Sequence, residues 1–230
     1  MRNVLLVNDN SALTQALSDY LRAQNWQVTT VSTAADGLRE AGSGSYDIVI
    51  LDDILPDMSG LDMLKKIRKK GAQPVIIFSE REDNIDRIIG LELGADDYFS
   101  YDSHDSNPRE LVARINTVLR RSQRAAPSPA AVNTDNLHIG SIALYPEKRQ
   151  VLLDNQPVAL TGAEFNLAEM LIRNAGRVVS KSELAVHALG KKPTKFDRSV
   201  DVHISSIRKK LGNPALIQTV RGVGYFFVKG

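Results

Sequence analysis

The chain has 230 residues, 43% of them hydrophobic, and contains no cysteine. Such a length suits one large or two ordinary globular domains, and the absence of cysteine excludes disulfides and thiolate metal sites. The net charge of +2 is unevenly spread, because residues 1–124 hold 15 basic and 19 acidic side chains whereas residues 125–230 hold 14 and 8. The basic second half indicates contact with nucleic acid. No apolar stretch reaches the roughly 18 residues of a membrane span, so we expect a soluble cytoplasmic protein without a membrane partner.

Strands and helices are predicted to alternate through the first half of the chain. Short apolar runs alternate with segments whose apolar residues recur at helical spacing. The predicted strands cover residues 4–7, 27–31, 46–52, 74–78 and 97–100, and the helices cover 11–25, 33–41, 61–70, 83–93 and 107 onward. Five such βα units predict an α/β fold with a doubly wound, five-stranded parallel sheet. No glycine-rich phosphate-binding motif marks it as a nucleotide binder.

Two of these predicted strands stop abruptly on polar residues. The apolar run 48–51 ends on Asp52, and the run 4–7 ends on Asn8 and Asp9. Ligands of open α/β sheets sit beyond the carboxyl ends of the strands, so these side chains are placed for chemistry. The alternative is that Asp52 only caps a helix or a turn.

A segment rich in proline and small residues separates the two halves. Residues 123–134 contain two prolines and no apolar periodicity, which predicts a flexible linker. Four short strand patterns at 137–139, 142–144, 150–153 and 158–160 then predict an antiparallel meander. Capping boxes at 161–164 and 180–183 predict the starts of two helices.

A third helix, predicted over residues 195–211, has two unlike faces. An apolar stripe about 80° wide is predicted to face the core, and it consists of Phe196, Val200, Ile204, Ile207 and Leu211. The opposite face carries small and basic side chains, namely Arg198, Val202, Ser205, Ser206 and Lys209. Such a face suits the DNA major groove, although an ordinary exposed helix is the alternative. A predicted hairpin over 217–228, with Arg221 at its tip, favours DNA binding.

Residues 1–122 resemble the flavodoxin-like receiver domain of two-component response regulators. The motifs that match are Asp52 followed by Pro56 and Gly60, then Ser79, Gly94-Ala-Asp-Asp-Tyr98 and Arg109-Glu-Leu-Val-Ala-Arg-Ile115. The resemblance implies that a sensor histidine kinase phosphorylates Asp52. It also implies Mg²⁺ ligands at Asp9, Asp52 and the Ile54 carbonyl, and a switch pair of Ser79 and Tyr98.

Two positions depart from that receiver pattern. Asn8 replaces one of two acids, which weakens a site for Mg²⁺, a cation that prefers carboxylate oxygens. Tyr101 replaces the lysine that would neutralise a phosphoryl oxygen. The loop over 100–106 is predicted to be rebuilt. We therefore expect weak or no dependence on phosphorylation, with conventional kinase control through Asp52 as the alternative.

The resemblance also implies a receiver homodimer. In this family, ion pairs between subunits hold the face formed by the fourth helix, fifth strand and fifth helix. The corresponding pairs here are Arg87 with Glu110, Asp97 with Arg114, and Asp96 with Arg121. Single exposed ion pairs contribute only about 0–1 kcal/mol, so the prediction rests on several pairs repeated by a two-fold axis.

Residues 135–230 resemble the α+β winged helix-turn-helix domain of OmpR/PhoB response regulators. The motifs are residues 197–211 and Thr219-Val-Arg-Gly-Val-Gly-Tyr225. The implied contacts with double-stranded DNA are to phosphates from Arg198, His203, Arg208 and Lys209, to bases from Val202, Ser205 and Ser206, and from the wing by Thr219 and Arg221. RNA polymerase is an expected partner. A phosphatase that uses Asp52 as nucleophile is the rival interpretation, but no DxDx[TV] pattern supports an enzyme.

Overall fold

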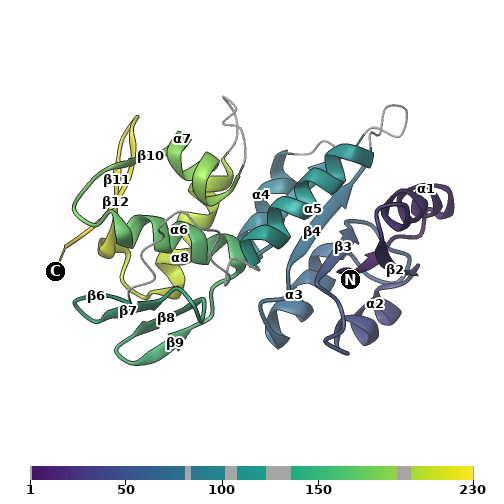
Figure 1. Ribbon diagram of the computed structural model, residues 1–230, viewed down its shortest axis with the longest axis horizontal. Coiled ribbons are helices and arrows are strands. Elements are labelled where there is room, and N and C mark those ends of the chain that lie inside the picture. Colours follow the sequence, from purple (N-terminus) through teal and green to yellow (C-terminus); the bar gives the residue numbers. More distant parts are fainter. Residues whose placement is uncertain (1, 81–83, 102–107, 123–135, 191–197, 230) are drawn as a thin grey trace. The chain divides into compact units, whose positions relative to one another are not determined.

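The structure is a computed structural model that describes residues 2–80, 84–101, 108–122, 136–190 and 198–229 (Figure 1). The chain divides into two compact units, Met1–Leu119 and Arg120–Gly230. The linker predicted over 123–134 and the rebuilt loop predicted after Tyr101 lie outside the described residues. Within the described ranges, no helix combines the length and the apolar character that a membrane span requires.

The first unit is the predicted doubly wound parallel sheet. Its strands are β1 (Arg2–Val7), β2 (Trp26–Val31), β3 (Ile48–Asp52), β4 (Val75–Ser79) and β5 (Asp97–Ser100), and its helices are α1 (Ser11–Arg22), α2 (Ala34–Ala41), α3 (Gly60–Lys70), α4 (Asn84–Glu92) and α5 (Pro108–Ser122). The strand order is β2-β1-β3-β4-β5, and all neighbouring strands are parallel. The prediction of a five-stranded parallel sheet is therefore confirmed.

Alternate side chains of each strand bury themselves on opposite faces of this sheet. Val4 and Leu6 of β1 join one core cluster with residues of α1 and α5. Val7, on the other face, lies against Gly37 of α2, next to Met63 of α3. Because helices cover both faces, the central strands β3 and β4 are buried along their whole length, which explains their continuous apolar runs in the sequence.

The parallel register brings four polar positions to one edge of the sheet. Val7 pairs with Leu51, so Asn8 follows β1 directly beside Asp52 at the end of β3. Ser79 ends β4 and pairs with Ser100, which immediately precedes Tyr101. These residues come from distant parts of the chain and meet only because the carboxyl ends of parallel strands share one edge.

The second unit is α+β. Its strands are β6 (Leu137–Ile139), β7 (Ile142–Tyr145), β8 (Gln150–Leu153), β9 (Gln156–Val158), β10 (Val179–Ser180), β11 (Ile217–Val220) and β12 (Gly224–Phe227). Its helical segments are α6 (Gly162–Arg173), α7 (Lys181–Glu183), the π-helical turn η1 (Leu184–Ala188), α8 (Ser199–Lys210) and the 3-10 turn η2 (Pro214–Leu216). The sheets have the orders β6-β7-β8-β9 and β10-β12-β11, and both are antiparallel.

The local signals for these helices behave as predicted. Thr161 and Ser180 both form complete capping boxes, at the starts of α6 and α7. In α8, the apolar stripe is buried from Val200 to Leu211, where it packs in one cluster with α6 and β12. Residues 191–197, including the first turn predicted for this helix and Phe196, lie outside the described residues.

Gly60 begins α3 and lies against the end of β3. A Cβ atom at this position would stand 2.0 Å from the backbone oxygen of Asp52. The Gly60 N–H also donates to the Asp53 carbonyl at 2.8 Å. Glycine at this position lets the loop after β3 fold back on itself, so that the start of α3 packs against the end of β3.

We predict that Gly60→Ala destabilises the first unit by on the order of 2–3 kcal/mol, because the new methyl group meets backbone that has little room to move. Gly71→Ala is the matched control, since a Cβ there meets nothing within 4 Å. The measurement is urea unfolding followed by the fluorescence of Trp26, the single tryptophan of the chain, which is buried in this unit. Equal stabilities of the two variants would contradict the prediction.

Candidate functional sites

The side chain of Asp52 is buried, and hydrogen-bond donors bind both of its oxygens. Asn8 Nδ2 donates to Asp52 Oδ2 at 2.6 Å, and the Ile54 N–H donates to Oδ1 at 3.2 Å. Asn8 Oδ1 in turn accepts from the Asn10 N–H at 2.7 Å, which orients the Asn8 amide. The amide therefore presents a donor to the aspartate, where an acid would present a second negative charge.

Asp53 is part of the same pocket, although the sequence analysis did not single it out. Ser79 is fully buried, and its hydroxyl donates to Asp53 Oδ2 at 2.7 Å. This serine was predicted to act as a switch residue with Tyr98, whose ring is also buried. The only sequence signal for Asp53 was its place next to Asp52.

The environment of Asp52 favours its protonated form. Burial is the main cause and a hydrogen bond with Asp53 is the next, and together they raise the pKa of Asp52 from 3.8 to about 7. A carboxyl group loses solvation in such a site, so its charged form becomes costly. A protonated Asp52 is a poorer nucleophile and a poorer cation ligand than a carboxylate.

Tyr101 forms the aromatic wall of the pocket. Its ring stacks on Phe78 with centroids 4.0 Å apart and planes 7° from parallel, and only 6% of the residue is exposed. Its N–H donates to the Ser79 carbonyl at 2.8 Å. Burial, followed by the charge of Asp52, raises the pKa of its hydroxyl, which stays neutral. We call Asn8, Asp52, Asp53, Ser79 and Tyr101 the acceptor pocket.

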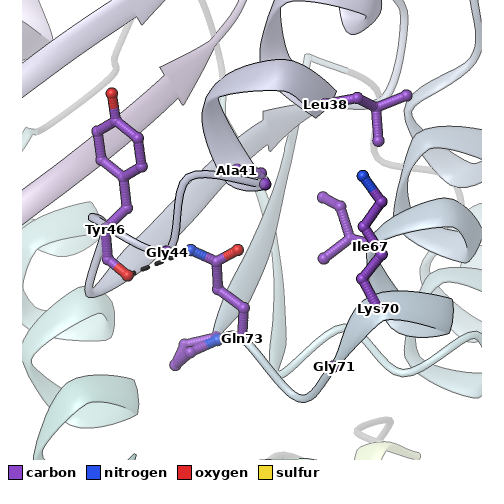
Figure 2. Close-up of a pocket in the computed structure, with 10 residues that line it drawn as sticks. Leu38, Ala41, Gly44, Tyr46, Ile67, Lys70, Gly71 and Gln73 are labelled. Carbon is purple, nitrogen blue, oxygen red and sulfur yellow. Dashed lines mark hydrogen bonds between the residues drawn. The ribbon is translucent and has the colours of Figure 1, made fainter.

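A separate cavity lies at the opposite edge of the sheet. It has a volume of about 360 Å³ and is lined by residues such as Leu38, Ile67 and Lys70 (Figure 2). Figure 2 shows Gln73 donating to the Tyr46 carbonyl, a hydrogen bond of 3.2 Å. Because its residues precede β3 and β4, the cavity is remote from Asp52 and does not belong to the acceptor pocket.

The residues predicted at the dimer face form ion pairs within the chain. Arg114 binds Asp97 at 3.0 Å and Glu110 at 2.8 Å. Asp96 is 3% exposed and binds Arg68 at 2.9 Å. The carboxylate of Asp96 is thus bound inside the fold, and its pairing between subunits stays a prediction. Its predicted partner, the side chain of Arg121, lies outside the described part of the structure, and Arg87 lies half-buried on α4.

The predicted DNA-binding residues divide into a surface group and a buried group. Arg198, Lys209, Thr219 and Arg221 are exposed, and Ser205 and Arg208 are half-exposed. Val202, His203 and Ser206 are only 7%, 1% and 8% exposed. The side chains of these last three are enclosed in this structure, and their contact with DNA stays a prediction.

The physical reason is that α8 is enclosed on more sides than its apolar stripe indicates. Ser206 donates to Glu164 of α6 at 2.5 Å, and Tyr225 of β12 donates to Asp201 at 2.6 Å. Polar side chains of α8 thus make hydrogen bonds with α6 and β12, which cover parts of the helix outside its apolar stripe. Periodicity detects only the apolar part of such a contact surface.

Arg208 connects α8 to the β11–β12 hairpin, here called the wing. Its guanidinium donates to the Ile217 carbonyl at 2.6 and 2.9 Å and to the Thr219 hydroxyl at 2.8 Å. It also lies over the ring of Tyr225. These contacts fix the wing relative to α8, a role that the sequence analysis did not assign to Arg208.

Comparisons with known proteins agree with both halves of the fold. Residues 4–116 match the family described as "Response regulator receiver domain", and residues 155–227 match "Transcriptional regulatory protein, C terminal". The chain is 38% identical to the transcriptional regulatory protein CpxR of Escherichia coli, over 99% of each protein. It is 37% identical to the sensory transduction protein RegX3 of Mycolicibacterium smegmatis, over 98% of each.

Solved structures show the same architecture. A mutant of RitR matches with 26% identity and a TM-score of 0.78 over 100% of both chains. DrrB of Thermotoga maritima, an OmpR/PhoB homolog, matches with 28% identity and a TM-score of 0.52 over 99% of both. The chain therefore belongs to the OmpR/PhoB family of DNA-binding response regulators. Members of this family are transcription regulators, not enzymes, and sensor kinases phosphorylate them.

Receiver domains typically bind Mg²⁺, a cation that prefers carboxylate oxygens. The oxygens predicted to bind it here are those of Asp9, Asp52 and the Ile54 carbonyl. Asn8 directs an N–H group at Asp52, one of these predicted ligands.

The raised pKa of Asp52 predicts how stability changes with pH. Between about pH 4 and 7, Asp52 keeps a proton in the folded chain that it releases in the unfolded chain. The contribution of Asp52 to stability is therefore fully present below its ordinary pKa of 3.8 and is lost as pH rises through about 7. Asp52→Asn has no carboxyl proton to lose, so its stability does not fall over this pH range for that reason. We expect it to stabilise the first unit at pH 8 by on the order of 2 kcal/mol, with the gain disappearing near pH 4.

Asp57→Asn is the control, because the pKa of Asp57 is shifted in the opposite direction to that of Asp52. Hydrogen bonds from the Ala34 and Ala35 N–H groups lower the pKa of Asp57, so its contribution is present at neutral pH and is lost as pH falls. Urea unfolding at pH 4, 6 and 8 measures both variants. If Asp52→Asn changes stability by the same amount at all three values, the assigned protonation of Asp52 is wrong.

Proposed function

We propose that this response regulator controls transcription with weak or no dependence on phosphorylation of Asp52. The observation that carries the proposal is the 2.6 Å hydrogen bond from the Asn8 amide to Asp52. Attack on a phosphodonor needs a carboxylate with a free oxygen and a nearby cation. In this pocket the oxygens are already bound by donors, and the pKa of about 7 lowers the fraction of carboxylate.

Tyr101 is the second residue that supports weak dependence on phosphorylation. A phosphoryl group on Asp52 would add negative charge next to Asp53 and Asp9. The neutral phenol at position 101, stacked on Phe78, offers no cation to balance that charge. Ser79, which would have to turn toward the phosphoryl group, is already bound to Asp53. In the unphosphorylated pocket, Ser79 and Asp52 thus already have hydrogen-bond partners.

The second candidate is conventional activation by a sensor histidine kinase. One observation favours it, since Asp52 keeps its place at the carboxyl end of β3, with the Gly60 turn beside it. Under this candidate the kinase supplies the orientation and the metal site that the isolated pocket lacks.

In either case, the second unit is proposed to dock on double-stranded DNA through α8 and the wing. Arg198, Ser205 and Lys209 remain accessible on α8, and Arg221 is accessible at the wing tip. Arginine at the wing suits a narrow minor groove, where the potential is most negative. RNA polymerase is the expected protein partner at promoters.

Restoring the two altered positions tests the proposal directly. We expect Asn8→Asp combined with Tyr101→Lys to increase phosphorylation of Asp52 by acetyl phosphate and Mg²⁺ by at least tenfold, since the changes supply an acid and a cation. Intact-protein mass spectrometry measures the gain. Asn10→Asp is the matched control, because it adds the same charge to the same loop at the exposed N-cap of α1.

The phosphorylation assay, together with an Asp52→Ala variant, separates phosphorylation-independent control from conventional control by a kinase. Under the proposal, Asp52→Ala leaves DNA affinity and target expression within about twofold of wild type, a change of only about 0.4 kcal/mol. A wild-type chain that is fully phosphorylated within minutes, or an Asp52→Ala variant that loses expression at normal protein levels, would establish conventional control.

We also propose that the unphosphorylated chain dimerises through α4, β5 and α5. Ile85 and Ile89 of α4 are 66% and 37% exposed, close in sequence to Arg87, and Glu110 is exposed on α5. Exposed apolar side chains among charges are typical of a protein interface.

We expect Ile85→Glu to weaken the dimer at least tenfold without changing the melting temperature of the chain. Sedimentation equilibrium at tens of micromolar measures the constant. Val186→Glu, at a 44% exposed apolar position of the second unit, is the control. A wild-type chain that stays monomeric would disprove the proposed dimer.

A further inference from the structure

Glu164 is a buried carboxylate that links the two main helices of the second unit. It has no exposed surface and lies in the first turn of α6. Its Oε2 accepts from the Thr161 N–H at 2.7 Å and from Lys210 Nζ at 2.6 Å, and its Oε1 accepts from the Ser206 hydroxyl at 2.5 Å. Thr161 is the N-cap of α6, whereas Ser206 and Lys210 belong to α8. One side chain thus completes a capping box and anchors a second helix.

The spacing of the two α8 partners makes this an orienting contact. Residues 206 and 210 are four apart, so they lie one turn apart on the same face of α8. Two attachments on one face restrict rotation of the helix about its axis as well as its distance from α6. Rotation determines which side chains of α8 point outward, including Ser205 and Lys209.

The contact also determines which lysine is available at the end of α8. Both lysines are exposed, but Lys209 forms no ion pair among the described residues, whereas Lys210 Nζ is bound to Glu164. Burial alone would raise the pKa of Glu164, but the charge of Lys210 and the hydrogen bonds hold that pKa below its ordinary value. Glu164 is therefore held as a carboxylate, and its charge lies against that of Lys210.

We propose that Glu164 is a positioning residue for DNA recognition, which fixes the rotation of α8 and keeps the charge of Lys210 away from DNA. The inference rests on the proposed use of α8 at the DNA surface. It assigns adjacent lysines to different tasks: Lys209 meets phosphates and Lys210 holds the helix. Glu164 contacts no DNA itself, and it acts only through Ser206 and Lys210.

Stability alone is a weak explanation for such a pair. Burying two charges costs desolvation that their attraction only partly offsets, so a buried ion pair often adds little to stability compared with apolar residues. Its directional hydrogen bonds do specify one arrangement of two helices, which apolar contacts specify less tightly. A role in orientation explains why a carboxylate occupies a site with no exposure.

The test is the salt dependence of DNA binding in four proteins, because each phosphate contact contributes about 0.9 to the slope of log K against log salt. The proteins are wild type, Lys209→Met, Glu164→Gln, and the double variant Glu164→Gln with Lys210→Met. The probe is a mixed-sequence 24-base-pair duplex, titrated between 50 and 250 mM salt. We expect the slope to become shallower by about 0.9 for Lys209→Met, steeper by about 0.9 for Glu164→Gln, which releases Lys210, and unchanged for the double variant.

The double variant keeps the experiment decisive if Glu164→Gln does not fold, because it removes both charges together and leaves no unpaired buried ion. If its slope is shallower by the same amount as that of Lys209→Met, Lys210 contacts DNA and the inference is overturned. If Lys209→Met leaves the wild-type slope unchanged, α8 does not meet DNA, and the proposed DNA surface fails together with the inference. The two failures are thus distinguishable.

A second measurement separates orientation from simple folding. A duplex selected from a random pool by the wild-type chain is compared with the mixed-sequence duplex. We expect Ser206→Ala to reduce the ratio of the two affinities by about tenfold, the equivalent of 1.4 kcal/mol. Lys210→Arg retains the ion pair and should preserve the ratio. A Ser206→Ala variant that lowers the melting temperature but keeps the full ratio would overturn the orienting role.

Discussion

The acceptor pocket depends on the parallel register of β1, β3, β4 and β5. That register places Asn8 beside Asp52 and brings Ser79 and Tyr101 to the same edge. Once the edge is assembled, the chemistry follows from which atoms face Asp52. An amide donor, a neighbouring carboxyl and a buried phenol surround it. These surroundings are the basis of the proposal that phosphorylation of Asp52 is weak or unnecessary.

The second unit follows a related design, in which polar groups specify how its elements dock. Glu164 joins α6 to α8, and Arg208 joins α8 to the wing through Ile217 and Thr219. Such side chains are costly to bury unless every hydrogen bond is made, so each contact favours one arrangement over its neighbours. These contacts fix how α8 lies against α6 and the wing. Under the proposals above, the residues that orient α8 are therefore different from those that meet DNA.

Both units contain ion pairs within the chain. In the first, Arg114 binds Asp97 and Arg68 binds Asp96. The second has the pair of Lys210 with Glu164, and it also keeps Lys209 and Arg221 exposed on the surface proposed for DNA. The excess of basic side chains in this half of the sequence suits a negatively charged partner.

The sequence by itself determined most strands and helices and the parallel sheet, because apolar periodicity and capping boxes are local signals. The polar ends of two strands located Asn8 and Asp52, and the resemblance to receiver domains located Tyr101. Only the tertiary structure decided what these side chains touch. Val202 and Ser206 were predicted on the outer face of the helix, yet α8 is covered by more than its apolar neighbours. Asp96, Asp53 and Glu164 likewise took roles set by partners far away in the chain, which no local pattern records.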